Sequence, residues 1–156
     1  MKSTFSRLIT AVLACLLICL STFAQETKVR EKNVPAAVVR AFKSAYPQAQ
    51  IRGYAKEKEH GKVFYEVESM DGTTHRDILY NPDGTVAEIE ERIAATDLPA
   101  EAQQTIHQKY PRATITIAEK ITIGDKIGYE VSAKQGKRRI SLEFDADGKL
   151  VKPNSK

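Results

Sequence analysis

The sequence has no tryptophan and only two cysteines among its 156 residues. Both cysteines, Cys15 and Cys19, lie in an N-terminal segment that ends at Ala24. A chain that begins at Gln25 therefore has no disulfide, no thiol nucleophile and no thiolate ligand for a metal ion. Such a chain depends on hydrophobic burial alone, which the sequence from Gln25 to Lys156 is long enough to provide.

The sequence also lacks a long hydrophobic run. Its longest apolar stretch, Leu8 to Leu20, is shorter than the roughly 20 residues that a membrane-spanning helix needs. A basic segment precedes this stretch, and Thr22 and Ala24 place small residues at positions −3 and −1 of a cleavage site. We predict a secretory signal peptide over residues 1–24, a periplasmic or secreted protein, and no stable membrane insertion after cleavage. A retained anchor and a lipoprotein are the alternatives.

No strong excess of one charge remains after the predicted cleavage. Loss of Lys2 and Arg7 leaves 22 basic and 20 acidic side chains, a net charge of +2, and the two signs are interspersed. The only tight basic cluster is Lys137 to Arg139, beside a predicted turn at Gly136. A nucleic-acid-binding protein would need a basic stripe with stacking aromatic residues, so we expect no nucleic-acid partner.

The residues that usually hold metals or cofactors are missing or poorly spaced. His60, His75 and His107 do not stand at metal-ligand spacing from other ligands. The Asp83-Gly84 and Asp147-Gly148 pairs lack the glutamate that closes a calcium loop, and they are more typical of hairpin turns. We therefore expect neither a metal nor a cofactor.

Catalytic motifs are absent too. The sequence has no nucleophile elbow and no glycine-rich phosphate loop. Glu88 and Glu90 share one face of a predicted strand, but acid–base chemistry would require a cleft and shifted pKa values. On an edge strand such charges more often prevent aggregation, and we interpret them in that way. We expect a protein that is not an enzyme.

The sequence does contain an internal repeat. The same motifs recur later in the chain at one constant spacing, and no gap is needed to align the two copies. The recurring pairs are Tyr46-Pro47 with Tyr110-Pro111, Tyr65-Glu66-Val67 with Tyr129-Glu130-Val131, Gly72 with Gly136, and Asp83-Gly84 with Asp147-Gly148. A period of this length indicates a duplicated supersecondary unit. We place a flexible leader at residues 25–32, the first repeat at residues 33–93 and the second at residues 97–151.

Each copy begins with helical periodicity and then changes to an alternation of period two. The helix should end at the Tyr-Pro pair, because the residue before proline is displaced from helical conformation. Asp-Gly and other glycine turns then separate the strand-like runs. The sequence predicts an α+β fold of two tandem repeats, each one helix followed by a four-stranded antiparallel sheet with one face covered and the other open.

Strand alternation divides the side chains between these two faces. The set expected to face the helices is Val63, Tyr65, Val67, Ile78, Tyr80, Ile127, Tyr129, Val131, Ile140, Leu142 and Phe144. On the open face of the first copy, Tyr54, Phe64 and Leu79 lie among polar residues and form a candidate partner-binding patch. The alternative is that these three side chains pack against the other repeat or the linker.

The order and spacing of these motifs resemble the PepSY-like family, also described as β-lactamase-inhibitor-like, from about Asn33 to Val151. The resemblance implies a tandem, β-lactamase-inhibitor-protein-like architecture and a binding role in the cell envelope. We therefore expect a non-enzymatic binding module that inhibits or modulates a peptidase or another envelope protein through its open sheet face. The alternative is a periplasmic sensor that binds a small ligand or signal between the repeats.

Overall fold

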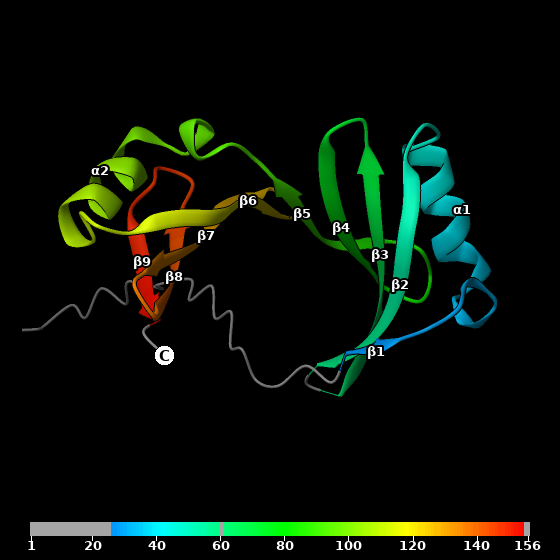
Figure 1. Ribbon diagram of the computed structural model, residues 1–156. Helices are drawn as coiled ribbons and strands as arrows, with labels where there is room; N and C mark the ends of the chain where they lie inside the picture. The colour runs from blue at the N-terminus through cyan, green and yellow to red at the C-terminus, as the bar shows by residue number, and fades with distance from the viewer. Residues whose placement is uncertain (1–25, 60, 155–156) are drawn as a thin grey trace, which may run out of the picture.

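The computed structural model describes residues 26–59 and 61–154. The predicted signal peptide and His60 lie outside this part of the chain. The described residues form one antiparallel sheet in which the strands follow the order of the sequence (Figure 1). The strands are β1 (Thr27–Lys28), β2 (Gln50–Glu59), β3 (Lys62–Asp71), β4 (Thr74–Tyr80), β5 (Val86–Arg92), β6 (Thr114–Ile123), β7 (Lys126–Gln135), β8 (Arg138–Asp145) and β9 (Leu150–Asn154).

Two helices stand at equivalent points of the chain. Helix α1 (Ala36–Ala45) precedes β2, and helix α2 (Ala100–Lys109) precedes β6. As predicted, each helix ends directly before a Tyr-Pro pair, at Tyr46 and at Tyr110. Two short 3₁₀ helices, η1 (Glu31–Asn33) and η2 (Ala95–Asp97), lie shortly before α1 and α2.

The sheet continues from the first half of the chain into the second. Strand β5 pairs with β4 on one side and with β6 on the other, from Ile89 opposite Thr122 to Arg92 opposite Glu119. The expectation of a separate four-stranded sheet in each repeat is therefore wrong. It follows that β5 is a central strand, and the interpretation of its glutamates as edge charges is wrong too.

The predicted flexible leader is partly built into the fold. Strand β1 pairs with β2, and the Val29 backbone N–H donates a hydrogen bond to the Tyr54 carbonyl at 2.9 Å. Val29 also packs against the first hydrophobic cluster. These contacts hold the segment before α1 against the sheet.

Two hydrophobic clusters lie between the helices and the sheet. The first joins Val38 and Phe42 of α1 to strand residues such as Val67 and Ile78. The second joins Ala102 and Ile106 of α2 to strand residues that include Val131, Ile140, Leu142 and Phe144. Most of the set that was expected to face the helices is buried in these clusters, although Ile127 is 37% exposed.

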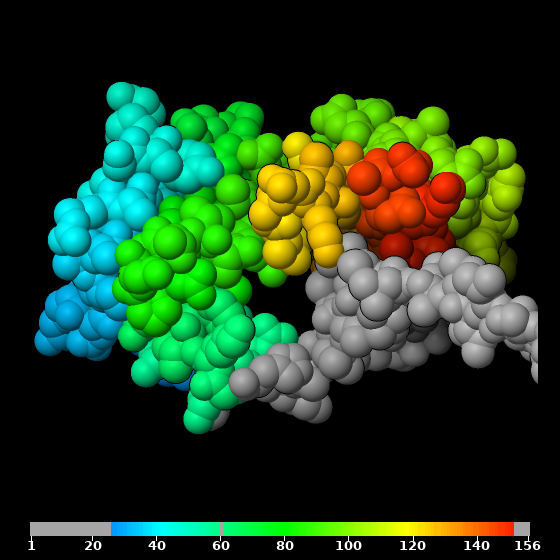
Figure 2. All heavy atoms as spheres, turned by 180° about the vertical axis from the view of Figure 1, so that it is seen from behind, coloured from blue at the N-terminus to red at the C-terminus, as the bar shows by residue number. Residues whose placement is uncertain are grey.

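Both helices lie on the outer side of a strongly curved sheet, one near each end (Figure 1). From behind, the β6–β7 hairpin lies between the atoms of the first half and the C-terminal strands (Figure 2). The helices cover one face of the sheet, and the opposite, concave face has no helix of the described residues on it.

Candidate functional site

The open face carries a band of acidic side chains that crosses both halves of the sheet. Cross-strand neighbours share a face, and the register brings together carboxylates that are far apart in the sequence. For example, Asp77 of β4 lies opposite both Glu68 of β3 and Glu90 of β5. The acidic band consists of Glu57, Glu66, Glu68, Asp77, Glu88, Glu90, Glu119, Glu130 and Glu143.

The middle of the acidic band is partly withdrawn from solvent. Burial, followed by the charges of Glu57 and Asp77, raises the pKa of Glu66 to about 8. Burial and then the neighbouring charge of Glu88 raise the pKa of Glu90 to about 8, and burial raises the pKa of Glu88 to about 7. These carboxyl groups bind protons near neutral pH because they are crowded together in a partly dry environment.

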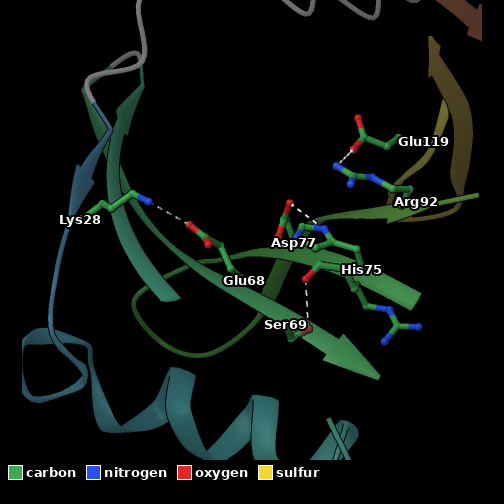
Figure 3. A network of polar contacts seen from close by, with 8 residues as sticks. Lys28, Glu68, Ser69, His75, Asp77, Arg92 and Glu119 are labelled. Atoms are coloured by element: carbon green, nitrogen blue, oxygen red, sulfur yellow. Dashed lines mark hydrogen bonds and ion pairs between the residues drawn. The ribbon is translucent and has the colours of Figure 1, made fainter. Parts of the chain in front are cut away.

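Three basic side chains lie beside carboxylates of this band (Figure 3). The Lys28 ammonium is 4.0 Å from Glu68, and the Arg92 guanidinium is 3.6 Å from Glu119. His75 Nδ1 is 3.5 Å from Asp77 Oδ2. In the described part of the chain, no lysine or arginine forms an ion pair with Glu66, Glu88, Glu90 or Glu130. The centre of the acidic band therefore has more acceptors than cations.

One buried acceptor of the acidic band is also unsatisfied. The Asp77 Oδ1 atom is buried and makes no hydrogen bond to any described residue. Burial is the main cause that raises the pKa of Asp77, and the charge of His75 opposes it. Asp77 thus has a hydrogen-bond acceptor just below the open face that no described residue uses.

Tyr54 does not lie on the open face, contrary to the prediction. Between Ile51 and Gly53 the register of β2 shifts by one residue, so that Tyr54 lies opposite Val67 on the covered face. Tyr54 is 8% exposed and belongs to the first hydrophobic cluster. A β-bulge explains this, since one extra residue reverses the alternation of a strand.

The register places the other two predicted residues, Phe64 and Leu79, among the acidic side chains. Phe64 lies opposite Glu57, and Leu79 lies opposite both Glu66 and Glu88. Both are partly exposed. Their role in binding stays a prediction.

A small apolar pocket indents the sheet at strands β6 to β9. Ile121 and Ile123 of β6 contribute to its lining, together with Val151 of β9. Glu130 and Glu143, two neighbours in the acidic band, complete one side, and Lys126 also contributes. Gly128 lies opposite Ile121, so a position without a side chain opens this pocket.

The geometry gives no positive sign of metal chemistry. Within residues 26–59 and 61–154, no group of three or more His, Cys, Asp or Glu side chains is arranged to hold a metal ion. Nor does any helix in these ranges have the length and apolar character needed to cross a membrane. What the open face can provide is a wide surface of carboxylates with a few apolar side chains.

Comparison with known proteins agrees with this architecture. The family model described as "Putative beta-lactamase-inhibitor-like, PepSY-like" matches residues 21–86 and again residues 62–152. The chain belongs to this PepSY-like family. No curated protein matches the sequence significantly.

Two solved structures illustrate the shared fold of this PepSY-like chain. A putative periplasmic protein from Bacteroides eggerthii is 12% identical with a TM-score of 0.68, over 78% of this chain and 88% of that one. A BLIP-like protein from Bacteroides fragilis is 17% identical with a TM-score of 0.58, over 76% of this chain and 84% of that one. At such low identity the likeness is one of fold, and the fold is BLIP-like.

Proposed function

We propose that this protein is a non-enzymatic binding module of the bacterial cell envelope that holds a protein partner against the open face of its sheet. The observation that carries the proposal is a wide, concave sheet face without a covering helix, on which the half-buried Glu66, Glu88 and Glu90 form no ion pair with a lysine or arginine of the described residues. Such carboxyl groups are costly to ionise in an isolated domain, and a second molecule that supplies cations would favour their charged form.

Two observations support a location in the cell envelope. The predicted signal peptide directs export, and a structural neighbour is described as a putative periplasmic protein. The PepSY-like, inhibitor-like family agrees with a role in binding rather than catalysis. The finer proposal is that the chain inhibits or modulates a peptidase or another envelope protein.

The proposed architecture behind this surface is a tandem repeat whose two units share one sheet. Helix α2 begins at the same distance along the chain from α1 as β6 does from β2 and β7 does from β3. The pairing of β5 with β6 makes their open faces continuous. A partner would therefore meet one surface rather than two.

The sensor alternative has less support. The apolar pocket at Ile121 and Gly128 is lined by residues of β6 to β9 and lies within the second half of the chain. It does not favour a small-ligand site between the repeats. A rise in melting temperature with a small envelope metabolite would favour the sensor instead.

The test is capture of partners from envelope extract by the chain from Gln25 onward and by the double variant Phe64→Ala/Leu79→Ala. Val86→Ala is a matched control, because Val86 is 50% exposed and lies opposite Tyr80, on the covered side of the sheet. We expect the double variant to lose a captured protein that wild type and Val86→Ala retain, while all three melt at similar temperatures. Equal capture by all three would place the binding site elsewhere.

A further inference from the structure

We propose that the partner presents a basic surface to the acidic band, and that one of its lysine or arginine side chains enters the apolar pocket at Gly128. This inference rests on the proposed function and specifies the chemistry of the partner. Three independent features support it: the balance of charge on the face, the unused acceptors, and the shape of the pocket.

The balance of charge on the open face is the first feature. Although the chain as a whole is slightly basic, the acidic band gathers carboxylates from every strand between β2 and β8. Among the described residues, the ion pairs with Lys28 and Arg92 involve Glu68 and Glu119, and neither involves the central carboxylates Glu66, Glu88 and Glu90. A face with this excess attracts cationic surfaces and repels acidic ones, which determines the class of partner.

The unused acceptors are the second feature. Glu66, Glu88 and Glu90 are partly buried, and in the described residues no lysine or arginine pairs with them. Asp77 Oδ1 is buried without a hydrogen bond inside the same ranges. Guanidinium and ammonium groups donate several hydrogen bonds each, so they satisfy both the charge and the lone pairs of such a surface.

The shape of the pocket is the third feature. A lysine or arginine side chain has an aliphatic stem and a charged end, and it binds best where an apolar channel leads to carboxylates. Ile121, Ile123 and Val151 provide the apolar part, while Glu130 and Glu143 provide two carboxylates at one side; Lys126 also lines the pocket, so the two carboxylates there face one cation of the chain.

Comparison of the two halves explains why the second half has this pocket. In the internal repeat, Gly128 is the equivalent of Phe64, and Ile121 is the equivalent of Glu57. In the first half Phe64 lies opposite Glu57, and in the second half Gly128 lies opposite Ile121. The large side chain of the first half is thus replaced by a gap with an apolar neighbour, which makes room for a side chain from a partner.

The experiment measures binding of a short peptide that contains three lysines separated by glycine and serine, by NMR titration of the ¹⁵N-labelled chain from Gln25 onward. Its matched control ligand is the same peptide with acetylated lysines. The test variant is Glu88→Gln/Glu90→Gln/Glu130→Gln. The control variant is Asp97→Asn/Glu101→Gln/Asp147→Asn, which removes the same number of carboxyl groups from exposed positions outside the acidic band.

We expect the lysine peptide to shift the amide signals of Gly128 and Ile121, and the acetylated peptide to leave them unchanged. The affinity should fall by about tenfold or more in the test variant and stay within about twofold of wild type in the control variant. Gly128→Ala should weaken binding as well, because its new methyl group occupies the pocket and would lie 3.1 Å from the Phe144 carbonyl oxygen.

Three results would overturn the inference: no binding of the lysine peptide, equal binding of the acetylated peptide, or equal loss in the test and control variants. If the double variant Phe64→Ala/Leu79→Ala still loses a protein partner in that case, the open face binds a partner that is not basic, and only this inference fails. If that capture experiment is negative too, the proposed function fails with it.

Discussion

The Tyr54 hydroxyl group connects strand β2 to the segment that precedes helix α1. It donates a hydrogen bond of 2.7 Å to Glu31 Oε2. This hydrogen bond is the largest cause that lowers the pKa of Glu31, followed by the charge of Lys43. The residue that was expected to contact a partner instead helps to hold the N-terminal segment on the fold.

The substitution Tyr54→Phe tests this role. It removes the donor but keeps the ring in the first hydrophobic cluster, so it should lower the melting temperature by a few degrees. The pKa of Glu31, followed by NMR titration, should rise toward its usual range. Capture of a partner should not change, because the ring lies on the covered face. A loss of capture without a change in Glu31 would contradict this placement.

The misplacement of Tyr54 has a local cause that the sequence does contain. A glycine within a strand often marks a bulge, and Gly53 lies directly after the extra residue, Arg52. A prediction that assumes strict alternation ignores this signal. It therefore places the side chains on one side of the bulge on the wrong face of the sheet. Phe64 and Leu79 were placed on the correct face because no bulge interrupts β3 and β4 where they pair with each other.

The turns before β5 and before β9 each contact a helix. A Cβ atom at Gly84 would lie 2.8 Å from the Ala37 carbonyl oxygen of α1, and one at Gly148 would lie 2.7 Å from the Pro99 Cβ atom. Both glycines also have positive φ, +89° and +84°. These two turns therefore need glycine for the backbone conformation and for the close approach to the helix.

Comparison of Gly84→Ala with Gly72→Ala separates the two requirements. Gly72 has a φ of +58°, but a Cβ atom there would meet nothing within 4 Å. Gly72→Ala should lower the free energy of unfolding by about 1 kcal/mol, the cost of a left-handed alanine. Gly84→Ala should cost about 3 kcal/mol, since α1 must also move. Urea denaturation measures both, and equal losses would show that the close approach to α1 contributes little.

The position of strand β5 in the middle of the sheet is the part of the fold that could not be predicted from the sequence. The helices, the hairpins and the division of side chains between two faces follow from local periodicity and turn residues. The pairing of β5 with β6 is a contact across the boundary between repeats, and no local signal specifies it. For this reason Glu88 and Glu90 were interpreted as edge charges rather than as the centre of the acidic band.

The acidic band as a whole depends on this junction. Its members are separated along the sequence by apolar and basic residues, so that the charge count of the chain is slightly basic and does not reveal the band. Cross-strand register collects them on one face, with Glu90 opposite Ile121 where the two halves meet. The junction therefore extends the carboxylates of the first half, on β2 to β5, into Glu119, Glu130 and Glu143 of the second half.

The acidic band makes the stability of the whole molecule depend on pH. Glu66, Glu88 and Glu90 have pKa values of about 8, 7 and 8 in the folded protein, against an ordinary value of 4.5. The folded state therefore binds protons more tightly than the unfolded state. This contribution to stability is fully present below pH 4.5 and is lost as the pH rises through 7 to 8.

We expect the free energy of unfolding to decrease steadily from about pH 5 to about pH 9, measured by urea denaturation in buffers of equal ionic strength. Below this window the exposed carboxylates Glu31 and Asp83 have the opposite effect on stability. Their pKa values are lowered in the folded protein, so their contribution to the free energy of unfolding is lost as the pH falls. The variant Glu66→Gln/Glu88→Gln/Glu90→Gln should flatten the dependence and melt above wild type at high pH. A wild-type stability that rises over the same window would contradict a crowded acidic face. Addition of the lysine peptide should stabilise wild type most at high pH, where the carboxylates are charged and most in need of cations.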